Sequence, residues 1–149
     1  MNEPSDRRHW LFSQLSEKQQ SLFLAIEAKQ PHPIQVGLRP SAGPNDPNPT
    51  APACEVREGG GAILVTSFED VSIAGVAHEL LHLKRYIIER QPQIVPKAGG
   101  DDHWTITSSI ENTIEHTYII PLEAAYGAKE EGYWEKTFLS NWELLDPER

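Results

Sequence analysis

His78, Glu79 and His82 form the pattern His-Glu-x-x-His in the stretch GVAHELLHLK. Residues four apart on a helix lie one above the other on the same face, so both imidazoles can reach a single metal ion. Zinc binds histidine nitrogen at about 2.0–2.1 Å, and its catalytic sites keep one position for water. Glu79 projects about 100° round the helix from His78, so its carboxylate lies beside the ion and can accept a proton from that water. We therefore expect His78 and His82 to bind Zn²⁺ and Glu79 to be the general base.

The pattern of apolar residues around the motif predicts which way the histidines face. On a helical wheel the two histidines fall with Gly75, Arg85 and Tyr86, opposite an apolar stripe formed by Ile73, Val76, Leu80, Leu83 and Ile87. The stripe can pack against a sheet while the histidines face an open cleft. Gly75, one turn before His78, leaves room for a substrate or for a neighbouring helix.

A third protein ligand has to come from elsewhere in the chain. The helix expected over residues 108–120 offers three candidates, of which His116 is the preferred one because neutral imidazole is a strong zinc ligand. Glu115 and Glu111 remain as alternatives, although Glu111 also stands at capping-box spacing after Ser108. His103 is a weaker option, since a loop holds a ligand poorly.

Further elements are predicted from periodicity and from helix-breaking residues. We expect an amphipathic helix over residues 13–29, a short strand within HPIQVGLRP, and a hairpin of strands 54–57 and 62–66. The motif helix should run over residues 69–89 from a start at Ser67, and the next helix should end before Pro121. This order predicts an α+β domain over residues 1–149, in which a short, mainly antiparallel sheet packs against the motif helix and further helices.

Two segments receive a different interpretation. SAGPNDPNPTAPA holds four prolines and should be a surface loop. The tail over residues 123–145 should be mostly helical, with a core-packing stripe at Trp134, Phe138, Trp142 and Leu145.

The composition of the chain restricts its expected cellular location and its expected partners. The chain has 149 residues, a formal net charge of -9 and a single cysteine, Cys54, interpreted as a small packing residue. An acidic chain without a basic face argues against a nucleic-acid partner. No stretch is long and apolar enough for a signal peptide or a membrane span, so we expect a cytoplasmic protein that does not bind membranes.

With GGAILVTS just before AGVAHELLHLK, the chain resembles the zincin metallopeptidases. In that superfamily a strand precedes the active-site helix, and extended substrate pairs with the edge of that strand. The resemblance covers residues 60–86 and a second helix, and in the glutamate-ligand members it implies Glu111 as ligand with Glu115 holding a histidine. Lys84 departs from the longer family pattern, and the metzincin extension is absent. The segment NTIEHTYIIP also resembles small bacterial proteins in which an Asn-x-x-x-His helix follows the motif.

Two functions from different classes fit these residues. The first is a zinc-dependent hydrolase, most simply a metallopeptidase acting on a peptide or protein substrate, with Tyr86, Tyr118 or Arg85 as a donor to the oxyanion. The second is a non-catalytic module in which a closed four-ligand zinc site joins two helices and the surface binds a protein partner. The chain is short, so a second copy or a protein partner could complete the cleft.

Overall fold

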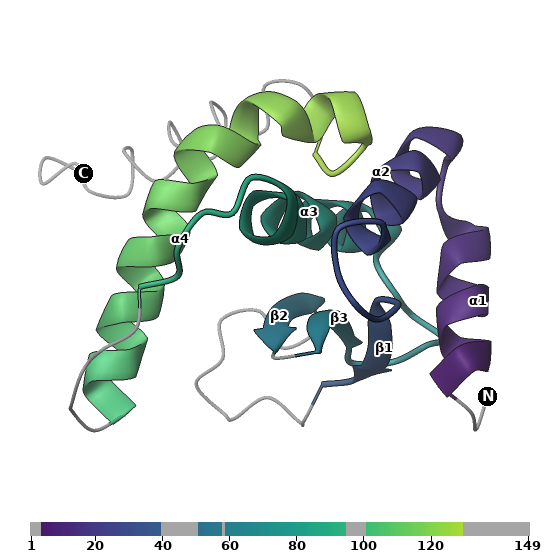
Figure 1. Cartoon of the computed structure of the whole chain (residues 1–149), viewed down its shortest axis with the longest axis horizontal. Coiled ribbons are helices and arrows are strands. Elements are labelled where there is room, and N and C mark those ends of the chain that lie inside the picture. The colour runs from purple at the N-terminus through teal and green to yellow at the C-terminus, as the bar shows by residue number, and fades with distance from the viewer. Residues whose placement is uncertain (1–3, 40–50, 58, 95–100, 130–149) are drawn as a thin grey trace, which may run out of the picture.

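The computed structural model describes residues 4–39, 51–57, 59–94 and 101–129. Four α-helices surround a small sheet: α1 (Pro4–Gln14), α2 (Glu17–Glu27), α3 (Ile73–Leu83) and α4 (Asp101–Glu123). The motif helix α3 lies over the sheet, with α1 and α2 on one side and the long α4 on the other (Figure 1). The predicted α+β class is confirmed.

The sheet has three strands in the order β1-β3-β2, namely β1 (Gln35–Leu38), β2 (Ala53–Arg57) and β3 (Gly60–Val65). The predicted hairpin is present: β2 and β3 pair antiparallel, and its turn requires glycine at position 60, where φ is 121°. However, β1 pairs parallel with β3, so the sheet is mixed and the prediction of a mainly antiparallel sheet is wrong. β1 and β2 follow one another in the chain but lie on opposite sides of β3, and no local sequence pattern reports that order.

The position of β3 changes the expectation about substrate binding. β3 immediately precedes the motif helix in sequence, but it is the central strand and pairs on both sides. Its backbone groups are therefore occupied, and extended substrate cannot pair with it. Among the described strands, β2 is the edge strand that contacts α3.

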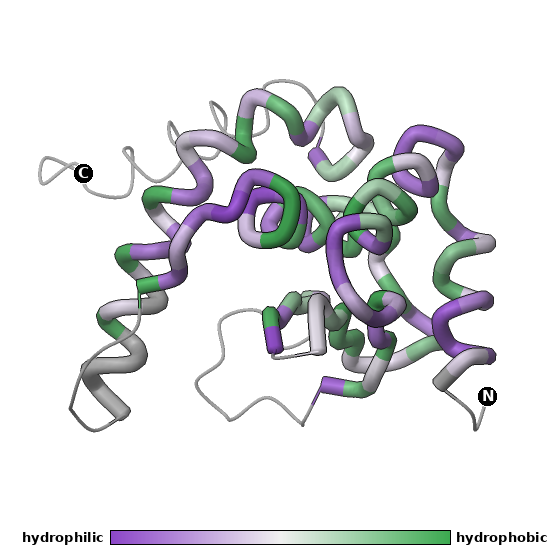
Figure 2. Tube along the Cα trace, viewed as in Figure 1, coloured by the Kyte–Doolittle hydropathy of each residue, from purple (hydrophilic) through white to green (hydrophobic). Residues whose placement is uncertain are grey.

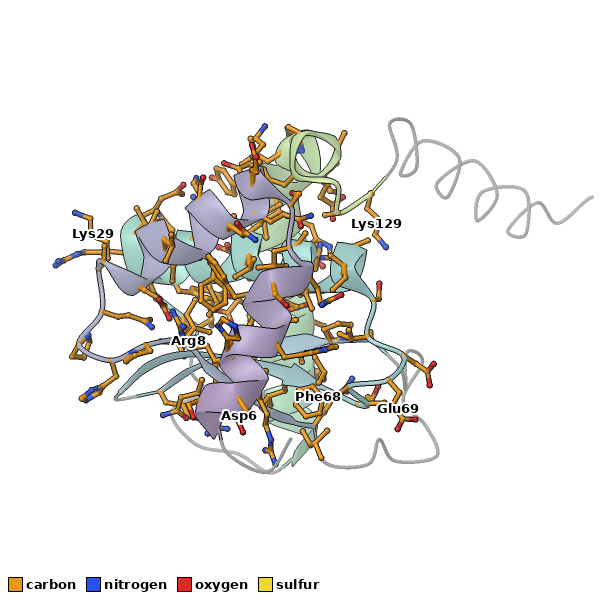
Figure 3. All side chains as sticks on the ribbon, turned by 90° about the vertical axis from the view of Figure 1, so that its right-hand side faces the viewer. Asp6, Arg8, Lys29, Phe68, Glu69 and Lys129 are labelled. Atoms are coloured by element: carbon orange, nitrogen blue, oxygen red, sulfur yellow. The ribbon has the colours of Figure 1, made fainter. Side chains whose placement is uncertain are left out.

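The N-terminal region forms two helices rather than the single one expected over residues 13–29. Ser16 begins α2 with a complete capping box, in which its side chain accepts from the Gln19 backbone and the Gln19 side chain accepts in return. The Glu27 carboxylate on α2 connects three elements. It accepts hydrogen bonds from the Arg8 side chain on α1 and from the backbone N–H of Ile34, just before β1. Arg8 is labelled on α1 in Figure 3. The core lies between these helices, α3 and the sheet, and includes Leu11, Phe23, Ile26, Ile63, Val76 and Leu80.

The motif helix begins later than predicted, and its last turns, which end at Ile88 close to the predicted end at Glu89, are wider than those of an α-helix. Its N-cap is Ser72, whose Oγ accepts from the Gly75 N–H at 3.0 Å, whereas Ser67 accepts from Glu69 in a preceding turn. The expected start at Ser67 is therefore wrong by one turn or more. At its other end α3 continues as a π-helix, η1 (Lys84–Ile88), and wider turns of this kind often accompany functional sites.

The second helix is longer than the sequence indicated. α4 begins at Asp101, seven residues before Ser108, so Ser108 does not cap it and Glu111 has no capping role. His103 lies in its first turns rather than in a loop. Pro121 falls inside the helix near its C-terminal end, and the chain turns only at η2 (Ala124–Tyr126) and Gly127, where φ is 66°. A proline so close to the end removes few hydrogen bonds, which explains why α4 reaches Glu123.

Most of the proline-rich loop and the tail stripe at Trp134, Phe138, Trp142 and Leu145 lie outside the described residues. Within the described part, no helix has the length and apolar character needed to cross a bilayer.

Candidate metal centre

Three histidines from two helices meet beside the motif. The ligand nitrogens of His78, His82 and His116 all lie within 4.8 Å of one another. The closest pair is the Nε2 atoms of His78 and His82, which are 3.2 Å apart. The predicted third ligand, His116, is thus placed by α4 against the motif helix, and its ring centroid is 5.1 Å from that of His78.

Glu123 fixes the orientation of the first histidine. Its Oε1 lies 2.5 Å from Nδ1 of His78, and the side chain is almost completely buried. A carboxylate can only accept, so His78 carries its proton on Nδ1 and presents a lone pair on Nε2 toward His82. A carboxylate behind a histidine is the usual support for a metal-binding imidazole.

The sequence interpretation missed Glu123. The signal was its spacing of seven from His116, which places both residues on the same face of a helix two turns apart. Because the helix was expected to end before Pro121, that spacing could not be read as helical. The resemblance had implied Glu115 for this supporting role, and the structure gives the contact to Glu123 instead.

The surroundings of the cluster lower the pKa of two of its imidazoles, His82 and His116. Burial, reinforced by His78 and His116, lowers the pKa of His82 to about 3. Burial also lowers the pKa of His116, with His78 acting in the same direction. Neutral imidazole is the form that binds metal, so these two side chains need not lose a proton to bind an ion at neutral pH.

Glu79 lies in the same pocket, supported by β2. The pocket measures about 450 Å³, and its lining includes Glu79, all three histidines and Cys54. Burial raises the pKa of Glu79, while the charge of His78 and hydrogen bonds from the Cys54 thiol and backbone oppose that rise. The Cys54 side chain, interpreted from sequence as a packing residue, therefore contacts the expected general base.

The acidic alternatives on α4 have other partners. Glu115 is buried, accepts from Arg85 Nε at 3.1 Å and lines a second pocket with Arg85 rather than the histidine pocket. Glu111 lines the pocket but is not in the three-histidine group, and its Oε1 accepts the Ile94 backbone N–H at 3.2 Å. Of the three α4 candidates, the structure groups His116 with the motif histidines.

Other expectations about the neighbourhood are corrected in part. His82 lines the pocket together with His78 but is buried, because α4 packs against α3. The space at Gly75 is taken by Pro52, since a Cβ there would lie 2.7 Å from the proline Cδ. Among the oxyanion donors considered, Tyr86 lines the pocket and stacks on His82, whereas Arg85 and Tyr118 line a second pocket.

Comparison with known proteins adds no assignment: no family model, no curated protein and no solved structure matches this chain.

Proposed function

We propose that this protein is a zinc-dependent hydrolase that cleaves a peptide or another amide, with His78, His82 and His116 as ligands. The observation that carries the proposal is the convergence of three imidazoles with one carboxylate, Glu79, in a single pocket. The motif that suggested two ligands lies on α3, and the third imidazole comes from α4, thirty-four residues beyond His82.

The donor set fits zinc in geometry and in chemistry. Two ligand atoms at about 2.0–2.1 Å from a tetrahedral ion are about 3.3 Å apart, close to the 3.2 Å between the Nε2 atoms of His78 and His82. The remaining nitrogen of the group lies within 4.8 Å, a separation that a side-chain rotation of His116 can reduce. Glu123 behind His78 supplies the supporting carboxylate that zinc-binding histidines ordinarily have.

The three histidines, Glu79 and Tyr86 then have distinct roles in the reaction. A zinc ion held by the three imidazoles supplies Lewis acidity toward a carbonyl oxygen and toward water. Glu79 accepts the proton of the attacking water and donates it to the leaving amine, and its raised pKa makes it a stronger base than a solvated glutamate. Tyr86 beside His82 is placed to donate to the developing oxyanion.

The closed structural site is the competing proposal, and it needs a fourth protein ligand. Glu115, the buried acidic candidate on α4, is engaged by Arg85 instead. In the described part of the chain the group contains three histidines, which leaves a coordination position for water. This count supports an open, catalytic site.

Metal analysis combined with one substitution tests the proposal. The purified protein should bind one zinc ion, and His78→Ala with His82→Ala should abolish stoichiometric binding. Glu79→Gln should retain zinc but reduce hydrolysis of a fluorogenic peptide library by about 10²-fold or more. Full activity in the Glu79→Gln protein would overturn the mechanism. Unfolding upon zinc removal, with no hydrolysis by the zinc-loaded protein, would favour the structural module.

A further inference from the structure

The second pocket, between η1 and α4, is small and lies beside the histidine pocket. Its volume is about 180 Å³, below the roughly 300–1,000 Å³ of pockets that hold whole ligands, so it has room for a single side chain. Its lining includes Arg85, Ile94, Glu111, Ile114, Glu115 and Tyr118. Glu111 also lines the histidine pocket, so its carboxylate stands at the border of the two.

Three segments of the chain border both pockets at once. In each segment one residue lines the histidine pocket and its neighbour in sequence lines the second pocket. The pairs are Tyr86 and Arg85 on η1, Gln93 and Ile94 after it, and Asn112 and Glu111 on α4. The two pockets are therefore neighbours, and a peptide bound at the histidines can place one of its side chains in the second pocket.

The second pocket has apolar walls that are open to a ligand. Ile94, Ile114 and Tyr118 are 44%, 47% and 54% exposed. Figure 2 shows hydrophobic residues recurring along α4, the helix that supplies two of these walls. A side chain with an apolar stem can cover such walls while its polar end reaches the carboxylate at the border, and lysine and arginine have this form.

The positive charges next to the pocket are balanced by carboxylates. Arg85 forms ion pairs with Glu115 and Glu89, and Lys84 also pairs with Glu89. Two cations thus share two carboxylates. Arg85 therefore gives the pocket no net positive charge.

Glu111 adds a negative charge that no neighbouring cation offsets. Among the described residues, no lysine or arginine forms an ion pair with it. Its carboxylate accepts hydrogen bonds from the Ile94 N–H and from the Tyr86 hydroxyl. A carboxylate offers about four acceptor sites, so Glu111 can accept further hydrogen bonds from a ligand.

We propose that the second pocket is a specificity subsite for a lysine or arginine side chain of the peptide substrate, whose cationic end donates hydrogen bonds to Glu111. This inference rests on the proposed function, since it takes the histidine pocket as the place of cleavage. Glu111 repels an acidic side chain, and a wholly apolar one removes water from the carboxylate without replacing its hydrogen bonds. The chain as a whole has a formal net charge of -9 and attracts basic peptides.

Hydrolysis of matched peptides tests the subsite. One lysine is moved through a capped alanine hexapeptide, and a parallel set carries norleucine, which has the lysine stem without the ammonium group. At one position the zinc-loaded protein should cleave the lysine peptide with a kcat/KM about tenfold above that of the norleucine peptide. Cleavage with a preference for norleucine, or with no difference at any position, would overturn the subsite while supporting the proposed hydrolase.

Substitutions then locate the preference. Glu111→Gln keeps an acceptor oxygen without the charge, and Ile114→Lys places a cation at the pocket, so both should reduce the lysine preference to about threefold or less. Ile110→Lys is the matched control, because Ile110 lies one turn away on α4, is 50% exposed against 47% for Ile114, and lines neither pocket. The ratio of the two kcat/KM values within one protein does not depend on the fraction of that protein that is active. A preference retained in Glu111→Gln, or lost equally in Ile110→Lys, would overturn the assignment.

Peptide affinity separates the failure of this inference from the failure of the proposed function. Calorimetric titration of the zinc-loaded Glu79→Gln protein measures binding without turnover, and the lysine peptide should bind about tenfold more tightly than its norleucine counterpart. This result does not require hydrolysis, so it tests the subsite even if no peptide is cleaved. Equal affinities, or no binding of either peptide, would overturn the subsite.

Discussion

The Nδ1 atom of His78 lies 2.5 Å from Oε1 of Glu123, a contact between residues 45 positions apart that joins the motif helix to the end of α4. Seven residues earlier on α4, the His116 ring lies 5.1 Å from the same imidazole, measured between centroids. α4 thus provides both a candidate ligand and the carboxylate that orients another. The relative position of α3 and α4 is therefore what makes a three-histidine group.

The role of Glu123 can be measured as metal affinity. Glu123→Gln keeps the shape and an acceptor oxygen but removes the charge, so zinc affinity should fall about 10-fold. Glu123→Ala should cost up to about 100-fold, because His78 is no longer oriented. Competition with a chromophoric chelator measures both, with the exposed Glu17→Gln as control. Wild-type affinity in Glu123→Ala would show that the contact is only structural.

The identity of the third ligand follows from a comparison of three substitutions on α4. His116→Ala should weaken zinc binding far more than Glu111→Gln, because Glu111 lies in the pocket but outside the three-histidine group. Glu115→Gln should mainly affect stability, since its partner is Arg85. Titration and thermal melting of each variant separate the two effects. Equal losses of affinity in His116→Ala and Glu111→Gln would favour the acidic alternative.

The sequence was informative where the pattern is local. The hairpin was predicted because its strands and turn are adjacent in sequence, and the motif histidines were expected on one face because they are four residues apart on a helix. His116 was chosen from its helix because imidazole is a strong zinc ligand, and the structure groups it with the motif histidines. The parallel pairing of β1 with β3 was missed, because the two strands are far apart in sequence and β2 lies between them along the chain. Glu123 was missed because Pro121 was taken as the end of a helix that continues for two more residues. The burial of His82 could not be predicted, because the wheel of one helix does not show that another helix covers it.

Arg85 holds α4 in place next to His116. Its guanidinium donates to Glu115 at 3.1 Å and to Glu89 at 2.5 Å, and it stacks 4.1 Å from the centre of the Tyr118 ring. Arg85→Met leaves the buried Glu115 carboxylate unpaired and should cost about 3–5 kcal/mol in the free energy of unfolding. Adding Glu115→Gln should recover much of that loss. Chemical denaturation measures both, with Arg57→Met as control.

The control is informative because Arg57 pairs with Glu55 on the surface, where both side chains are largely exposed. An exposed pair of this kind contributes about 0–1 kcal/mol. A similar loss for Arg85→Met and Arg57→Met would show that the ion pair between η1 and α4 adds nothing to the packing of the two helices.

The Cys54 thiol should react slowly. Burial, followed by the charge of Glu79, holds the pKa of this thiol well above its usual range, so little thiolate is present at neutral pH. Disulfide exchange with an aromatic disulfide reagent should be much slower than for a free thiol. Glu79→Gln should speed the reaction only in part, because burial is the larger cause. Rapid reaction of the wild-type protein would contradict the packing of Cys54 against Glu79.

The metal-free protein should lose stability as the pH falls below about 6.5. His82 has a folded-state pKa of about 3, against an unfolded value near 6.5, so between these values the unfolded chain binds a proton that the folded protein excludes. The contribution of His82 to the free energy of unfolding should therefore be fully present above pH 6.5. It should fall by up to about 1.4 kcal/mol per pH unit toward pH 3. His82→Asn removes the titrating group, so denaturant titrations from pH 7 to 4 should show a shallower slope than for the wild type. A slope unchanged by His82→Asn would mean that the ring gains access to water and is protonated in the folded protein.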